Sequence, residues 1–397
     1  MAVLLLLLAG PAHAAGSLAH REVLPNGAVL LVAERPAIPI VVVRVGVPGG
    51  AVRDPADALG VANLTAELLT RGTARRSGPE LDRAIEFVGG SLEAGAGSDG
   101  ATITLSVLKK DLGLGLDLLA EVLLHPTFPA DELARKVTDI KAALQRSEQS
   151  PETVAARELS RLMFPGHPYG RPPAGTIESV GKLTREQVTA FYERHYRPDG
   201  ASIVAVGDVT VAEIRRELLP RLAGWAPPPA PVAAVPQAPL VVPAQERRIT
   251  RDLTQTTALL GRPAIRQVDP DYFPLAVATY ILGGGSTSRL YTRVREERGL
   301  AYSVYSSVLP GRYGASYLVS LQTRTDGVVE AGRLVREEMA RLGREPVAPR
   351  ELALAKSYLI GSFPLRLDTS GKLARFLGAV EESGLGLDYP DRYKEQI

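Results

Sequence analysis

Residues 60–73 read GVANLTAELLTRGT, a stretch whose apolar side chains recur at roughly helical intervals. This periodicity predicts a helix over residues 57–69. Asp54 and Asp57 precede it as candidate caps, because aspartate side chains accept hydrogen bonds from the free N–H groups of a first helical turn. Gly72 follows as the stop signal.

The sequence on either side of this helix alternates between strand-like and helix-like segments. Apolar runs predict strands at residues 28–33, 40–47, 101–108, 201–207, 256–260, 301–308 and 316–323. Amphipathic periodicity predicts further helices at residues 77–88, 111–124, 130–148, 183–195, 272–282, from 286 to about 298, 327–342 and 348–362. Strands followed by helix pairs recur in both halves, so we predict an α+β fold with a duplicated architecture.

A proline-rich segment separates the two halves. Residues 226–244 read APPPAPVAAVPQAPLVVPA, whose prolines favour extended geometry typical of a semi-rigid linker. We therefore predict domains at 16–225 and 246–397, joined by a linker at 226–245. Residues 391–397 read as the opening of a helix without a stop signal, so we expect the native chain to continue beyond them.

The amino terminus is typical of an export signal. Residues 2–9, AVLLLLLA, are far shorter than the roughly 20 apolar residues that span a bilayer, so we expect no membrane span. Ala12-His13-Ala14 follows as a small-x-small cleavage pattern. We expect residues 1–15 to be removed as a signal peptide and the mature protein to be periplasmic.

The composition excludes several classes of protein. Hydrophobic residues make up 45% and charged residues 23% of the 397-residue chain, which is ordinary globular usage. Its 46 basic and 44 acidic residues leave a formal net charge of +2, so we expect no nucleic-acid partner. The chain has no cysteine, which excludes disulfides, thiolate zinc sites and cysteine nucleophiles.

Residues 60–73 resemble the helix that carries the inverted zinc motif of the insulinase/pitrilysin (M16) metalloprotease family. The resemblance continues in order through LPNG (24–27), HPYGRP (167–172), GT (175–176), YRPD (196–199), VGD (206–208), GGG (283–285), SRL (288–290) and VREERGLAYS (294–303). It implies two homologous α/β domains of the LuxS/metallohydrolase-like kind. Each has an antiparallel-rich sheet covered by helices, and together they form half of a clamshell chamber.

The zinc half of the family's active site is missing from this sequence. In the family motif H-x-x-E-H, two histidines one helical turn apart bind zinc and the glutamate acts as general base. The matching positions here are Asn63, Ala66 and Glu67, and the later glutamate ligand matches Ala143, or its neighbour Ala142. We therefore expect no metal on this chain, and we expect Glu67 to be solvated or hydrogen-bonded.

The remaining histidines offer no substitute ligand set. His125, His167 and His195 have no pair at helical i, i+3 or i, i+4 spacing. His125 precedes a proline at a predicted helix end, and His167 lies in a turn rich in glycine and proline. His195 lies in the last turn of a predicted helix, where the helix dipole favours a cation.

The sequence retains the positions that match the other half of the family's active site. In the family, an arginine and a tyrosine seven residues apart in the second domain reach the substrate and polarise the scissile carbonyl, and Arg295 and Tyr302 match them. Taken without the resemblance, the two are a helix-end arginine with an ion-pair partner and a strand tyrosine. We expect Gly283, Gly284 and Gly285 to form a substrate-facing turn, because glycine permits positive φ and close backbone approach.

This pattern resembles the non-catalytic subunit of a heterodimeric protease. We expect the chain to bind unfolded peptides and to supply Arg295 and Tyr302 to a zinc-bearing partner with an H-x-x-E-H motif, with little hydrolysis by itself. One alternative is a structural or assembly protein that kept the fold and lost the reaction. The other is a free-standing metallopeptidase with an unrecognised ligand set.

Overall fold

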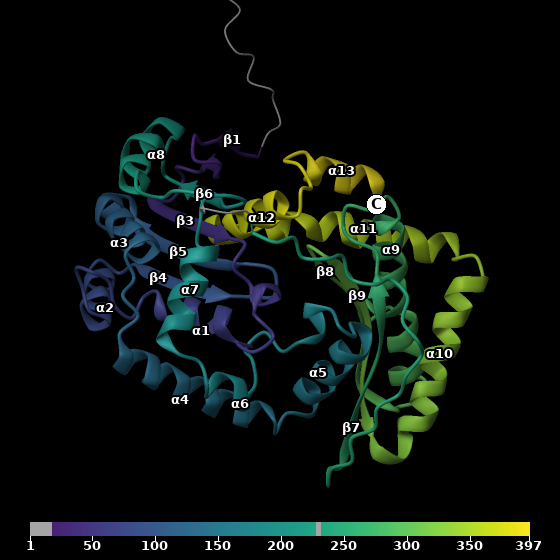
Figure 1. The fold of residues 1–397 in the computed structure, drawn as a ribbon. Helices are drawn as coiled ribbons and strands as arrows, with labels where there is room; N and C mark the ends of the chain where they lie inside the picture. The colour runs from purple at the N-terminus through teal and green to yellow at the C-terminus, as the bar shows by residue number, and fades with distance from the viewer. Residues whose placement is uncertain (1–17, 228–231) are drawn as a thin grey trace, which may run out of the picture.

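The computed structural model describes residues 18–227 and 232–397, which form two β-sheets with helices around them (Figure 1). The predicted signal peptide at 1–15 lies outside the described residues, as do residues 228–231 of the predicted linker. The predicted α+β fold with two sheet-based domains is confirmed.

The first sheet contains six strands in the spatial order β1-β2-β6-β3-β5-β4. All neighbours are antiparallel except β2 and β6, which are parallel. The strands are β1 (His20–Val23), β2 (Val29–Glu34), β3 (Ile40–Val47), β4 (Ser91–Ala96), β5 (Ala101–Leu108) and β6 (Ser202–Gly207).

The second sheet is antiparallel, with three strands in the order β7-β9-β8. Its strands are β7 (Gln255–Ala264), β8 (Ala301–Gly311) and β9 (Gly314–Arg324). Strand β8 therefore lies at one edge of this sheet.

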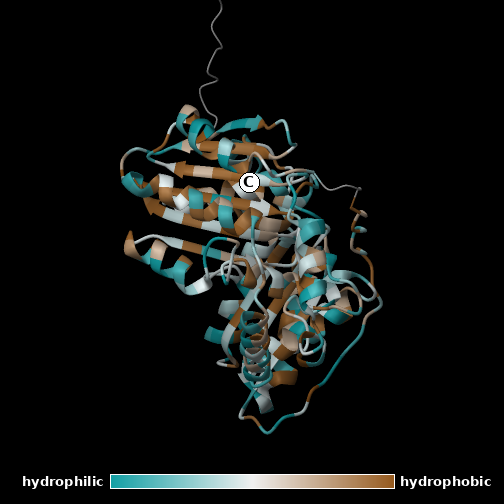
Figure 2. Cartoon of the chain, turned by 60° about the vertical axis from the view of Figure 1, so that its left-hand side comes forward, coloured by the Kyte–Doolittle hydropathy of each residue, from teal (hydrophilic) through white to brown (hydrophobic). Residues whose placement is uncertain are grey.

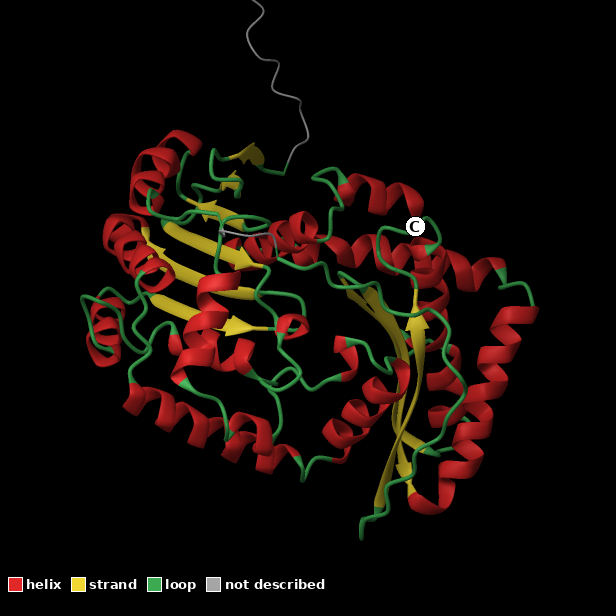
Figure 3. Cartoon of the chain, viewed as in Figure 1, coloured by secondary structure: helices red, strands yellow, loops and turns green. Residues whose placement is uncertain are grey.

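The helices cover the sheets, as Figure 3 shows in red. In the first half they are α1 (Val61–Leu68), α2 (Gly78–Phe87), α3 (Leu112–Leu124), α4 (Ala130–Ser147), α5 (Pro151–Met163), α6 (Ile177–Val180), α7 (Arg185–His195) and α8 (Val211–Leu218). In the second half they are α9 (Tyr272–Gly283), α10 (Val328–Arg344), α11 (Pro349–Ser362), α12 (Ser370–Glu382) and α13 (Tyr389–Gln396). No helix among residues 18–227 and 232–397 is long and apolar enough to cross a membrane.

Strand β3 shows why the first sheet is buried on both faces. Its sequence IVVVRVGV is rich in β-branched residues, which fit a pleated sheet. Val41, Val43 and Val45 enter the main core, whereas Val42 points to the opposite face among residues of α12. Figure 2 shows the sheet strands mostly in brown and many surrounding helix faces in teal, as this burial requires.

Each half contributes a helix to the other half's sheet. Helix α12 packs on β3 and β6, where Leu373 and Leu377 contact the outer face of the first sheet (Figure 1). Helix α5 packs on β7. Gly261 permits this contact, since a Cβ there would lie 2.9 Å from both Leu159 Cδ2 and Met163 Sδ.

Two polar contacts fix the junction between the halves. Arg44 Nη1 on β3 donates to Glu382 Oε1 on α12 at 2.6 Å. Arg21 on β1 donates to both oxygens of Glu381, each at 2.8 Å. The side chain of Arg44 is only 12% exposed, and Gly378 makes room for its guanidinium.

Several elements were absent from the sequence predictions. Strand β4 reads SLEAGA, which lacks the β-branched and aromatic residues that identify strands. Helices α5, α8 and α12 were also not predicted. Where a helix ending near Arg298 was expected, residues Tyr291–Glu296 form a π-helix. A π-helix has i→i+5 hydrogen bonds, so it departs from the 3.6-residue period on which the prediction depends.

Candidate functional site

Helix α1 carries the residues that match the zinc motif, and Asp54 caps it. The Asp54 carboxylate accepts hydrogen bonds from the backbone N–H of Gly60 at 2.6 Å and of Ala62 at 3.0 Å. Gly60 has a φ of 91°, a left-handed conformation that starts the helix at Val61 instead of residue 57. Burial raises the pKa of Asp54 to about 7, although the two backbone donors act in the opposite direction.

The motif positions on α1 form a network closed within the chain. Asn63 Nδ2 donates to Glu67 Oε1 at 3.1 Å, one helical turn away. Lys136 Nζ, from α4, lies 3.2 Å from Glu67 Oε2. Ala66, at the general-base position, is fully buried in the core. The prediction that Glu67 is hydrogen-bonded is confirmed.

Helix α4 supplies a cation where the family resemblance places a ligand helix. Ala143 is exposed on α4, and Lys136 precedes it by two helical turns, which puts both on one face. Lys136 was not predicted from the sequence, although its spacing of seven residues from Ala143 could have indicated it. No cluster of three or more histidine, cysteine, aspartate or glutamate side chains able to hold a metal occurs among the described residues.

The three histidines have different surroundings in the fold. His167 lies in a turn, where its Nδ1 accepts from the N–H of Tyr169 at 3.1 Å and its Nε2 lies 2.9 Å from the carbonyl oxygen of Pro236. His125 ends α3. The expectation that His195 is a helix-end cation is wrong: burial, with Arg53 and Arg194 nearby, lowers its pKa to about 4.

Arg295 and Tyr302 lie next to each other on the second domain. The Arg295 guanidinium carbon lies 5.5 Å from the centroid of the Tyr302 ring and 4.8 Å from that of Tyr291. The Tyr302 side chain is 75% exposed. The structure thus brings the two predicted residues together as a half-buried arginine beside an exposed tyrosine. Tyr291, whose ring also lies next to Arg295, was not predicted.

The neighbouring arginines differ from Arg295 in having acidic partners. Arg289 donates to both oxygens of Glu351 at 2.7 Å, and Arg293 donates to Glu338, a buried carboxylate on α10. These contacts hold the π-helix against α10 and α11. Within the described part of the chain, no carboxylate lies within 4.0 Å of Arg295, so the ion-pair reading of this arginine is not supported.

Two backbone irregularities orient this pair. Arg295 lies in the π-helix, a form that is frequent at functional sites. Tyr302 is the extra residue of a β-bulge, because Ala301 pairs with Thr323 while Ser303 pairs with Gln322. Bulges redirect a side chain out of the regular pleat, which accounts for the exposure of Tyr302.

The glycine run has a packing role. A Cβ on Gly283 would lie 2.4 Å from the backbone nitrogen of Ser306, so close approach of α9 to β8 requires glycine there. A Cβ on Gly284 would lie 2.6 Å from Tyr280 Cα. None of Gly283, Gly284 and Gly285 adopts a positive φ. That these glycines form a substrate-facing turn stays a prediction.

The two candidate regions remain separate in the fold. Helix α1 belongs to the first domain, whereas Arg295 and Tyr302 belong to the second. No hydrogen bond, ion pair or ring contact joins the two sets within residues 18–227 and 232–397. Among the described residues, the motif positions on α1 and the Arg295–Tyr302 pair are therefore two separate groups.

Two family profiles match the chain in tandem. Residues 29–177 match the insulinase family, peptidase family M16, and residues 182–359 match the peptidase M16 inactive domain. Among curated relatives, an uncharacterized zinc protease of Mycobacterium tuberculosis is 32% identical over 385 residues, which cover 94% of this chain and 85% of that protein. A non-peptidase homolog in Helicobacter pylori is 26% identical over 362 residues, covering 89% and 82%.

Solved structures show the same architecture. A peptidase M16 inactive domain from Pseudomonas fluorescens superimposes with a TM-score of 0.87 at 29% identity, covering 95% of this chain and 90% of that one. A protease from Helicobacter pylori gives a TM-score of 0.88 at 18% identity, covering 96% and 93%. The second similarity concerns the fold alone.

Proposed function

The chain belongs to the insulinase family of peptidases, M16, as a member of the non-catalytic type, and from this premise we propose that it completes the active site of a zinc-bearing partner subunit. In this proposal the chain binds unfolded peptide and presents Arg295 and Tyr302 to it. The partner carries an H-x-x-E-H motif and supplies the zinc and the general base. The proposed compartment is the periplasm, based on residues 1–15.

The side chains at the motif positions of α1 support the proposal that this chain does not hydrolyse peptides by itself. A zinc site needs several deprotonated ligands around an open position. Here Glu67 is the single carboxylate at the motif, and it is already paired with Lys136 and Asn63. A methyl group occupies the base position at Ala66, so nothing at that position can accept a proton from water.

The proposal is carried by one observation: the half-buried Arg295 lies against the ring of the exposed Tyr302 and has no carboxylate within 4.0 Å among the described residues. A guanidinium and a phenol are both hydrogen-bond donors. Donors fixed near a scissile carbonyl stabilise the oxyanion that develops as a nucleophile attacks. Because Tyr302 is exposed, a peptide held by a second subunit can reach these donors.

Reconstitution tests the proposal. A zinc-bearing H-x-x-E-H homologue from the same organism is assayed on a quenched fluorescent peptide library with this chain added as wild type or as Arg295→Ala/Tyr302→Ala. A matched control is Arg298→Ala/Tyr305→Ala, which removes an arginine and an exposed tyrosine a few residues away. We expect cleavage only with both chains, a loss of about 100-fold in the first variant and near-wild-type rates in the control.

The other outcomes separate the alternatives. Equal rates for both variants, with a partner shown to bind, would contradict the proposed role and support an assembly protein. Chelator-sensitive cleavage by this chain alone would show a free-standing metallopeptidase.

A further inference from the structure

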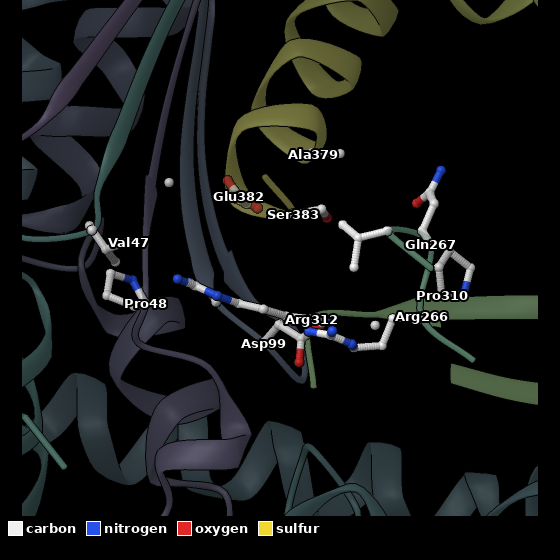
Figure 4. Close-up of a pocket in the computed structure, with 15 residues that line it drawn as sticks. Val47, Pro48, Asp99, Arg266, Gln267, Pro310, Arg312, Ala379, Glu382 and Ser383 are labelled. Atoms are coloured by element: carbon white, nitrogen blue, oxygen red, sulfur yellow. The ribbon is translucent and has the colours of Figure 1, made fainter. Parts of the chain in front are cut away.

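A cavity of about 280 Å³ lies at the junction of the two halves (Figure 4). The first half contributes the end of β3 and the β4–β5 turn, and the second half contributes the loop after β7, the β8–β9 turn and the end of α12. The cavity is smaller than a typical drug-sized ligand pocket. It therefore fits a small group or the end of a longer ligand.

Two arginines line the cavity without acidic partners. Arg266 comes from the loop after β7 and Arg312 from the β8–β9 turn, and both side chains run along the cavity in Figure 4. Among the described residues, no carboxylate lies within 4.0 Å of either guanidinium. The nearest aromatic partner of Arg312 is Tyr313, at 5.9 Å from its ring centroid.

The two carboxylates in the cavity wall are already engaged. Glu382 accepts from Arg44 at 2.6 Å. Asp99 accepts from the Tyr169 hydroxyl at 2.6 Å and from the backbone N–H of Arg312 at 2.9 Å. The Arg44–Glu382 bond and the bond from the Arg312 N–H to Asp99 cross between the two halves, whereas the bond from Tyr169 to Asp99 lies within the first half. The guanidiniums of Arg266 and Arg312 thus remain as its available charged donors.

Much of the rest of the wall is apolar, formed by Val47, Pro48, Val268 and Pro310. Gln267 and Ser383 add two uncharged polar side chains. A free oxyanion such as phosphate would use only the arginines. A ligand that carries a carboxylate next to an apolar group would use both the arginines and this surface.

We infer that this cavity binds the C-terminal carboxylate of a peptide whose last residue is apolar. Arginine guanidiniums recognise carboxylates through paired charge-assisted hydrogen bonds, and the side chains of Arg266 and Arg312 both line this cavity. This inference rests on the proposed peptide-binding function and adds a chain-end specificity to it. Peptides with a free C-terminus would be anchored at Arg266 and Arg312, independently of Arg295 and Tyr302.

The test compares two probes that differ only at the carboxylate. A fluorescein-labelled glycine–serine hexapeptide that ends in valine is prepared as the free acid and as the C-terminal amide, and binding to the full chain is followed by fluorescence anisotropy. We expect the acid to bind about 10- to 100-fold more tightly than the amide, as one charge-assisted contact pair implies. Equal affinities for acid and amide would overturn the inference. This comparison needs no variant.

A variant locates the site. Arg266→Gln/Arg312→Gln should abolish the preference for the acid, whereas Arg247→Gln/Arg262→Gln, which removes the same charge from exposed positions, should retain it. Retention of the preference in the first variant would overturn the assignment to this cavity. If the acid preference holds while reconstituted cleavage is insensitive to Arg295 and Tyr302, the proposed function fails and the carboxylate site stands. If cleavage depends on Arg295 and Tyr302 but acid and amide bind alike, only this inference fails.

Discussion

Lys136 Nζ lies 3.2 Å from Glu67 Oε2, so an ammonium group from α4 neutralises the only carboxylate at the former metal-motif positions. The other Glu67 oxygen accepts from Asn63 at 3.1 Å. The side chains of Lys136 and Glu67 are 22% and 31% exposed, which makes this a partly buried pair. Helix α1 is therefore stabilised within the chain and does not depend on a metal.

A double-mutant cycle should detect this pair. Lys136→Met and Glu67→Gln are expected to show a coupling energy of about 0.5–1 kcal/mol in urea unfolding, because the pair is partly shielded from solvent. Lys182 and Glu178 form an almost fully exposed i, i+4 pair and provide the control, for which we expect a weaker coupling than for Lys136 and Glu67. Additive effects of Lys136→Met and Glu67→Gln would refute the network.

Zinc should neither bind nor stabilise this protein. Ligand binding to the native state raises stability, so a chain without a metal site is unaffected by the metal or by its removal. After incubation with zinc and gel filtration, we expect substoichiometric zinc by mass spectrometry and an unchanged melting temperature in 1,10-phenanthroline. One zinc per chain, with a lower melting temperature in the chelator, would show that this chain carries a zinc site.

The Arg44–Glu382 contact should contribute more to stability than its exposed counterpart. Arg44→Met leaves a partly buried carboxylate with only the Ser202 hydroxyl at 3.3 Å, and we expect a loss of about 2 kcal/mol. Arg21→Met removes an arginine whose side chain is 42% exposed, against 12% for Arg44, and should cost at most about 1 kcal/mol. Equal losses in the free energy of unfolding in urea would show that burial of the arginine does not distinguish the two pairs.

Several helices and strands could be predicted from the sequence, whereas the contacts between distant segments could not. The apolar run at 101–108 and the periodicity at 272–282 depend on local residues, and both elements form there. Glu67 and Lys136 are 69 positions apart, so their contact depends on how α1 and α4 pack. The packing of α12 on the other domain's sheet likewise depends on tertiary contacts, and no local sequence pattern predicts it.

The candidate site shows the same division. The pairing of Arg295 with Tyr302 followed from a motif, whereas the π-helix and the β-bulge that orient them depend on contacts with α10 and β9. His195 shows how local reasoning fails: the helix dipole favours its charged form, but burial outweighs that effect.

The buried His195 should make stability sensitive to mild acid. Its pKa is lowered from 6.5 to about 4, so the folded protein binds fewer protons than the unfolded chain between these values. Stability from this group is complete above about pH 6.5 and is lost as the pH falls towards 4, by up to about 1.4 kcal/mol per pH unit.

The variant His195→Gln isolates this effect. Its free energy of unfolding should depend less steeply on pH than that of the wild type between pH 4 and 6.5. The raised pKa of Asp54 gives the opposite sign, with stability falling as the pH rises towards 7, but Asp54 is present in both proteins and cancels in the difference. Parallel pH profiles for the two proteins would contradict a neutral, buried His195.

If this chain donates hydrogen bonds to the substrate in a partner's active site, as proposed, the Tyr302→Phe variant should slow cleavage. Phenylalanine keeps the ring that stacks with Arg295 and removes only the hydroxyl. In the reconstituted complex, we predict a fall in kcat of about 10- to 100-fold with KM changed less than about twofold, because the lost contact forms in the transition state. Tyr305→Phe should leave both constants unchanged. A wild-type kcat for Tyr302→Phe, in a complex whose cleavage depends on this chain, would contradict the proposed role of the Tyr302 hydroxyl in the transition state.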